Sequence, residues 1–164
     1  MFSAVRLVRD GTLARGLAGA LAENPPEFDP QRSPDKVWVK IKGFSCNFRD
    51  KALALQAVQG RPDGYYVIGS EFVGEVQQTG IHVHDFQPGD RVIANNSWPF
   101  APDGLPGGVP TNHAGKEYQA FRPAQLVKIP RQMSDAEAFG IACLYASIIL
   151  FASLPNCPSN FAGN

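Results

Sequence analysis

The sequence carries no excess of charge of either sign. Its 15 basic and 15 acidic side chains give a formal net charge of +0 at pH 7. A nucleic-acid-binding surface needs clustered positive charge to neutralise phosphates, so this balance argues against a nucleic-acid partner. Hydrophobic residues make up 44% of the 164 residues and charged residues 18%, which is typical of one folded domain with its own core.

Long apolar runs are also lacking. The longest, 139–154, is interrupted by Gly140, Cys143 and Tyr145, and it is shorter than the roughly 20 residues that a membrane-spanning helix needs. The amino terminus has the charge of Arg6 among its apolar residues, so it lacks the uninterrupted core of a signal peptide. We therefore expect no membrane partner and a cytoplasmic protein.

Cysteines with metal-type spacing are missing as well. The chain has three cysteines, an odd number, at widely separated positions: Cys46, Cys143 and Cys157. Structural zinc sites use closely spaced cysteine pairs, and a reduced, cytosolic protein fits this set better. His82 and His84 could share one face of a strand, but no third ligand is near them in sequence. We interpret them as surface histidines and expect no metal.

Glycine and proline, in contrast, are plentiful. The 16 glycines and 14 prolines fall between short apolar runs, a pattern that indicates an all-β barrel or sandwich. The segment "KVWVKIKGF" (36–44) alternates apolar and polar residues and predicts a strand. Gly69 and Gly74, inside another strand-like run, suggest bends or a close approach of backbones. Further strands are expected in three segments: 1–11, 86–95 and 116–130, the last with a turn at Pro123.

Two segments have a helical pattern. Residues 47–59 predict a short helix. Residues 133–153 predict a long one, which begins at a capping box formed by Ser134 and Glu137. The long helix is apolar nearly all round, so we expect something else to pack on it. The loop 95–113, rich in Pro, Gly and Asn, is long enough to be functional or disordered.

The motifs follow one another in a distinctive order. The chain reads strand, "NFRD", helix, "IGSEFVGEV", "GDRV", "EYQAF", "KIP" and capped helix. Over about residues 36–152 this order resembles the catalytic, GroES-like domain of the medium-chain dehydrogenase/reductase superfamily. The resemblance implies a mainly β fold with a few helices: a partly open GroES-like β-barrel over 1–152, followed by an irregular tail at 153–164.

The residues at the zinc-ligand positions resemble those of the zinc-independent branch. Asn47 stands where the zinc alcohol dehydrogenases have a cysteine, and Ser70 and Glu71 stand where they have a His-Glu pair. Amides and hydroxyls are poor zinc ligands. Cys46 is one residue early and so points to the opposite side. "NFRD" instead resembles quinone oxidoreductases, acrylyl-CoA reductases and the enoyl reductase domains of fatty acid and polyketide synthases.

The resemblance implies hydride transfer from NADPH to the β-carbon of an enone, a quinone or an enoyl thioester. In those enzymes NADPH lies between this domain and a Rossmann domain, whose Gly-rich turn holds the pyrophosphate. No such motif occurs in the sequence. We therefore expect a truncated reductase that neither binds NADPH tightly nor is redox-active alone. The alternative is a stand-alone module with a non-redox role, either cyclase-like in biosynthesis or in protein interaction.

Site residues follow from the same resemblance. Asn47 would lie near the nicotinamide and donate a hydrogen bond to the substrate oxygen that gains charge; its alternative role is a helix N-cap. Phe48 would be a pocket wall or a core residue. Asn47, Phe48 and Arg49 together would bind the cofactor. Asp50 would pair with Arg49 or sit in a solvated first helical turn.

Other implied residues complete the pocket. Tyr65 and Tyr66 would protonate the α-carbon, with a structural aromatic role as the alternative. Ser70 and Glu71 would form a hydrogen-bonded pair and, with Phe48 and Trp98, line the substrate pocket. The partners would be a small-molecule substrate and, over the helix 135–152, either the missing Rossmann domain or a second copy of the chain.

Overall fold

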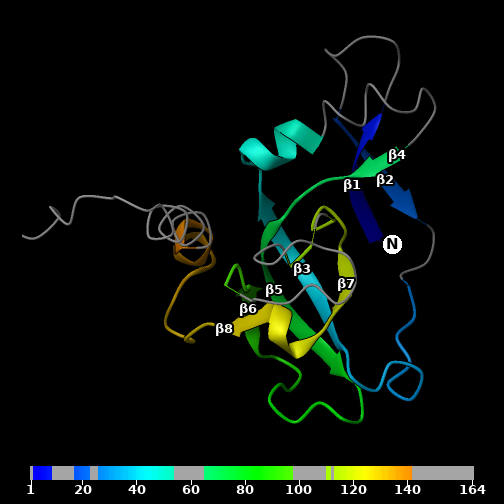
Figure 1. The fold of residues 1–164 in the computed structure, drawn as a ribbon, viewed down its shortest axis with the longest axis vertical. Coiled ribbons are helices and arrows are strands. Elements are labelled where there is room, and N and C mark those ends of the chain that lie inside the picture. Colours follow the sequence, from blue (N-terminus) through cyan, green and yellow to red (C-terminus); the bar gives the residue numbers. More distant parts are fainter. Residues whose placement is uncertain are drawn as a thin grey trace, which may run out of the picture.

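The computed structural model describes residues 2–8, 17–22, 26–53, 65–97, 110–111 and 113–141 (Figure 1). The tail 153–164, most of the loop 95–113 and the second part of the helix 135–152 lie outside these residues. Within the described part, no helix is long and apolar enough to cross a membrane.

The larger sheet has five strands in the order β7-β3-β5-β6-β8, and every neighbouring pair is antiparallel. The strands are β3 (Val37–Ser45), β5 (Glu71–Thr79), β6 (Arg91–Ala94), β7 (Tyr118–Phe121) and β8 (Leu126–Lys128). The sheet has β7 and β8 as its edges and does not close on itself, which confirms the mainly β, partly open fold. The turn η2 (Pro123–Gln125) joins β7 to β8, as the sequence predicts.

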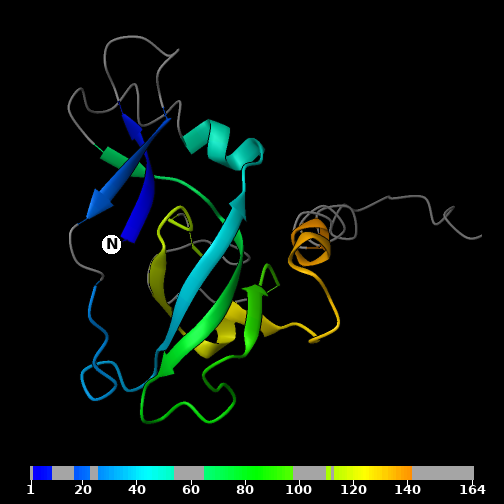
Figure 2. The ribbon, with the colours of Figure 1, turned by 180° about the vertical axis from the view of Figure 1, so that it is seen from behind.

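A smaller sheet has the order β2-β1-β4. It is built from β1 (Phe2–Val8), β2 (Leu17–Ala22) and β4 (Tyr65–Val67), again antiparallel (Figure 2). The strand β2 was not predicted, because its Ala- and Gly-rich sequence has low strand propensity. Its extended form depends on pairing with β1 along its whole length.

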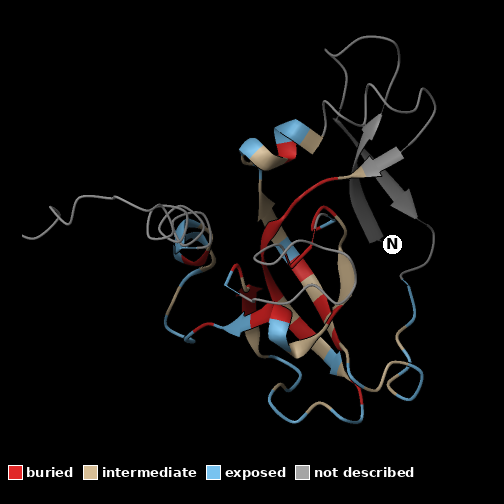
Figure 3. Cartoon of the chain, in the orientation of Figure 1, coloured by how far each residue is buried: buried red, intermediate tan, exposed pale blue. Residues whose placement is uncertain are grey.

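Strand β5 is buried on both faces (Figure 3). Phe72 and Val76 join a core with the alternating apolar residues of β3, and the Phe72 ring stacks on Phe121 at 4.7 Å between centroids. Val73 points to the other face and packs with Ala138 of the helix 135–141 in a second core. The helix therefore covers the outer face of the sheet, beside β6 and β8 (Figures 1 and 2).

Glycines let the backbones approach where the sheet is tightest. A Cβ on Gly74 would lie 2.5 Å from Val39 Cγ1 and 2.9 Å from the Lys40 carbonyl oxygen. A Cβ on Gly43 would lie 2.6 Å from the tip of the Phe139 ring, so this ring seats the helix directly on the backbone of β3. The close approach expected at Gly74 is confirmed.

The helix 135–141 is fastened at its first turn. The capping box is confirmed: Glu137 Oε2 accepts from the Ser134 backbone N–H at 2.7 Å, and Ser134 Oγ accepts from the Glu137 N–H at 3.2 Å. The Arg91 guanidinium on β6 donates to the carbonyls of Arg131 and Met133 and pairs with Asp135. The anchoring role of Arg91 is not visible in the sequence, because these contacts join residues 40 to 44 positions apart.

We expect Gly74→Ala to destabilise the chain by about 1–3 kcal/mol, because the new methyl group must displace Val39 or the β3 backbone. Gly140→Ala is the matched control: its Cβ meets nothing within 4 Å, and alanine favours a helix by about 1 kcal/mol over glycine. Urea unfolding followed by circular dichroism measures both. Equal effects of the two substitutions would contradict the close approach.

We expect Ser134→Ala to raise the pKa of Glu137 toward that of an ordinary glutamate. The Ser134 hydroxyl and backbone N–H lower the pKa of this carboxyl, so its contribution to stability is present above the unfolded pKa and is lost as pH falls through the folded one. Carboxyl ¹³C NMR across the acid range measures the shift. Ser33→Ala, on a remote loop, is the control; an unchanged Glu137 titration in Ser134→Ala would contradict the cap.

Candidate functional site

Polar side chains from three strands converge at one end of the larger sheet. Ser45 ends β3, Glu71 begins β5 directly opposite it in register, and Asn96 follows β6. The Glu71 carboxylate is 4% exposed; Oε2 accepts from Ser45 Oγ at 3.2 Å and Oε1 accepts from Asn96 Nδ2 at 3.2 Å. We call these three residues the polar cluster.

The residues of the polar cluster are not the same as those that the sequence predicted to line the substrate pocket. Ser70 and Glu71 are both buried, and the hydrogen bonds of Glu71 go to Ser45 and Asn96 rather than to Ser70. Sequence reasoning missed these two partners. Ser45 could have been found only from the β3–β5 register, and Asn96 only from the pairing of β5 with β6.

Asn47 lies next to the cluster, between β3 and the helix 48–53. Its carbonyl accepts the Lys51 N–H at 3.2 Å, the first bond of the helix, so it holds the N-cap position. Its side chain does not complete the cap: among the described residues, Oδ1 is buried and has no hydrogen-bond partner. The amide oxygen is therefore available to bond with another group. Leaving it without a hydrogen bond lowers the stability of the fold, and a capping bond would have avoided this loss.

Asp50 provides the cap instead. Its Oδ2 accepts the backbone N–H of Asn47 at 3.0 Å, which is the reciprocal half of a capping box. Its Oδ1 accepts the N–H of Gly69 at 2.9 Å. The residue is 2% exposed, so the expectation of a solvated first helical turn is wrong for Asp50. Burial is tolerated because both oxygens receive a donor.

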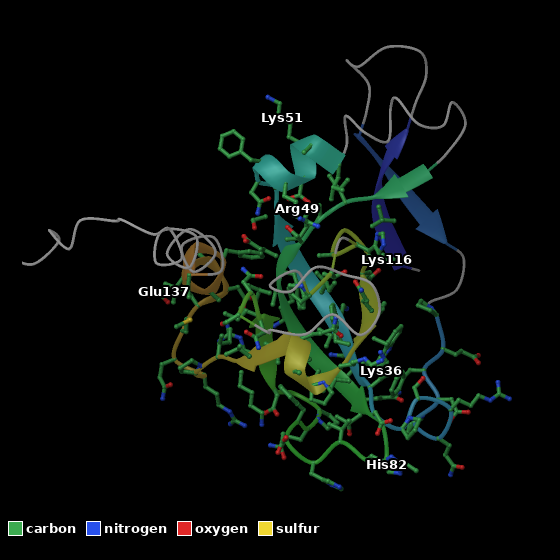
Figure 4. All side chains as sticks on the ribbon, in the orientation of Figure 1. Lys36, Arg49, Lys51, His82, Lys116 and Glu137 are labelled. Atoms are coloured by element: carbon green, nitrogen blue, oxygen red, sulfur yellow. The ribbon has the colours of Figure 1, made fainter. Side chains whose placement is uncertain are left out.

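Phe48 lies at the start of this helix and is 91% exposed. The interpretation as a core residue is wrong, because the helix turns this side chain away from both cores. Arg49 is half-buried, and Figure 4 shows it on the side of the helix that faces the sheet, whereas Lys51 extends away from it. An exposed aromatic ring therefore stands beside the buried amide of Asn47.

The other sequence-predicted residues fall elsewhere. Tyr65 and Tyr66 belong to β4 and pair with β1, and their side chains lie outside the described part. Trp98 is not among the described residues. His82 and His84 are exposed, as expected, and His82 Nδ1 lies 3.1 Å from Asp35 Oδ1.

The donor set near Asn47 offers little to a metal ion. The described residues contain no group of three or more His, Cys, Asp or Glu side chains that could hold one. Burial, and then the negative charge of Asp50, raise the pKa of the Cys46 thiol, so it stays protonated at neutral pH.

The sequence and the fold match known proteins. Residues 33–131 match the family model of the alcohol dehydrogenase GroES-like domain. An acryloyl-coenzyme A reductase of Metallosphaera sedula is 32% identical over 132 residues, which cover 71% of this chain and 39% of the relative. The chain thus spans about two-fifths of that relative's length.

Solved structures agree on the fold. A quinone oxidoreductase of Pseudomonas syringae pv. Tomato DC3000 aligns with a TM-score of 0.57 at 24% identity, covering 86% of this chain and 37% of that one. A putative zinc-binding dehydrogenase of Sinorhizobium meliloti 1021, bound to NADP, aligns with a TM-score of 0.60 at 24% identity, covering 92% of this chain and 45% of that one. The chain described here belongs to the alcohol dehydrogenase GroES-like domain family of the medium-chain dehydrogenase/reductase superfamily.

Proposed function

We propose that this chain forms the substrate-side wall of a zinc-independent, NADPH-dependent reductase of quinones, enones or enoyl thioesters. One observation carries the proposal: the Oδ1 atom of Asn47, two residues after Ser45 of the polar cluster, is buried and has no partner among the residues that the structure describes. A protein rarely buries an amide oxygen unsatisfied, and a catalytic role is one of the explanations that such a group calls for. Turning the amide exchanges Oδ1 and Nδ2, so the position can accept from a hydroxyl or donate to a carbonyl.

The acidic groups around Asn47 support a site that works without zinc. Both oxygens of Glu71 and both oxygens of Asp50 accept hydrogen bonds from protein donors, so each carboxylate already has bonding partners without a cation. A polar cluster saturated in this way can hold the shape of a pocket, and we assign it that role.

The residues present fit a nicotinamide cofactor. Bound NADPH would supply the hydride. The Asn47 amide, Phe48 and Arg49 would meet the cofactor, through a hydrogen bond, ring contact and positive charge respectively. The same amide would stabilise the negative charge that develops on the carbonyl oxygen of the substrate. Tyr65, Tyr66 or a water molecule would then protonate the α-carbon, and Trp98 would complete the pocket wall.

A non-redox module is the second candidate, and exposed apolar side chains favour it. Phe48 is 91% exposed and Ile141 is 38% exposed. Apolar side chains left in solvent often mark a surface that a protein partner covers, in trans or as a second copy of the chain. The two candidates differ in whether a small carbonyl ligand binds near Asn47.

We expect this chain to bind NADPH with a dissociation constant weaker than about 100 μM, because no Gly-rich turn for the pyrophosphate occurs in its sequence. Isothermal titration calorimetry of the purified chain with NADPH measures the constant. Its control is AMP, which lacks the nicotinamide. A micromolar constant for NADPH would show that the chain holds the cofactor by itself and would reject this part of the proposal.

We expect Asn47→Ala to weaken the binding of a carbonyl ligand by about tenfold, the value of one lost hydrogen bond. Crotonyl-CoA and duroquinone are suitable probes; the ring of duroquinone is fully substituted, so Cys46 cannot add to it. Amide NMR shifts at residues 45–50 and 69–71 report the binding.

Gln78→Ala, which removes an exposed amide from the far part of β5, is the matched control and should bind as the wild type does. Shifts confined to other regions, or equal affinities of the wild type and Asn47→Ala, would count against the reductase. Absence of any binding would favour the non-redox module.

A further inference from the structure

A short segment crosses beside the candidate site and is held by hydrogen bonds along its length. It comprises residues 68–70, which join β4 to β5, and we call it the strap. The backbone N–H groups of Ala114 and Gly115 donate to the carbonyls of Gly69 and Ile68 at 2.8 and 2.7 Å. The strap is therefore fixed to the segment 113–115, independently of the helix 48–53.

Gly69 of the strap has a backbone conformation that directs its N–H to Asp50, the residue that also accepts the N–H of Asn47. Its φ is +109°, which L side chains rarely adopt, and a Cβ there would lie 2.8 Å from the Phe44 ring. Only glycine meets both conditions. In this conformation the N–H of Gly69 points to Asp50 Oδ1 at 2.9 Å.

Asp50 thus joins two segments that are separate in the sequence. One carboxylate oxygen takes the N–H of Gly69 in the strap, and the other takes the N–H of Asn47. We propose that Asp50 is the positioning residue that holds Asn47, and hence its unpartnered amide, against the strap at the candidate site. The inference rests on the proposed function, because the proposed function gives the Asn47 amide its role.

The chemistry of the bridge requires a carboxylate. An ionised carboxylate has two acceptor oxygens and hydrogen bonds that are about twice as strong as neutral ones. Asparagine at position 50 would keep one acceptor and place an N–H₂ group against the second backbone donor. Among the described residues, Oδ1 of Asn47 has no hydrogen bond that would hold its side chain, so in this inference the position of the amide depends on the backbone that Asp50 holds.

Asp50→Asn and Asp50→Ala test the inference in the ¹⁵N-labelled chain. The readout is the side-chain NH₂ group of Asn47, assigned by its loss in Asn47→Ala. We expect NH₂ resonances shifted from random-coil values, with the relaxation of an ordered group, in the wild type, and resonances near random-coil values with the relaxation of a mobile group in both variants, while the amide shifts of Val73 and Val76 in the cores stay unchanged. Asp85→Asn, which changes an exposed carboxylate, is the matched control.

A double-mutant cycle adds a readout that a purely structural role would not move. If Asp50 acts through Asn47, then Asp50→Asn weakens crotonyl-CoA binding by about as much as Asn47→Ala, roughly tenfold, and the double variant loses no more. Additive losses, or an Asn47 amide that stays ordered in both Asp50 variants, would overturn the inference. If no ligand binds at all, the proposed function fails, and the order of the amide still decides the role of Asp50.

Hydrogen exchange in the wild-type chain covers the case in which both variants fail to fold. The N–H groups of Asn47 and Gly69 share one carboxylate, so the inference expects protection factors that agree within about threefold, set by one shared opening. Free exchange at Asn47 alongside a protected Gly69 would show that Asp50 holds the strap alone, and would overturn the inference.

Discussion

The close pairing of β3 with β5 is the constraint on which the rest of the structure depends. Strand β5 has a core on each face, and the missing side chain of Gly74 allows β3 to approach it. The same register sets Ser45 opposite Glu71, so the packing of the sheet also assembles the polar cluster. The register between β3 and β5 therefore determines both the packing of the sheet and the position of the polar cluster.

The sequence was sufficient to predict features that depend only on residues close to one another in the chain. The alternation of 36–44 predicted β3, and the spacing of Ser134 and Glu137 predicted a cap that the structure contains. Period and capping depend on neighbours within a few residues, so one sequence suffices to detect them. The motif order extended this to the fold family, which the match over residues 33–131 bears out.

Whether a residue is buried or exposed was harder to predict than whether it lies in a helix or a strand. Asp50 looked like a solvated residue of a first turn, and Phe48 like a core residue, yet the carboxylate is buried and the ring is exposed. The burial of Asp50 depends on where the strap passes, which is a contact across 19 residues. The partnership of Glu71 with Asn96 is also non-local, so neither composition nor period could reveal it.

The contact between Phe139 and Gly43 defines the seat of the helix 135–141 by an empty position on β3. Because the ring occupies the volume that a Cβ would need, a larger residue at position 43 requires Phe139 to move. The absence of a side chain at this point of β3 therefore marks where the helix lies. Redesign of this face would have to treat position 43 and the aromatic ring together, since the size of one residue limits the other.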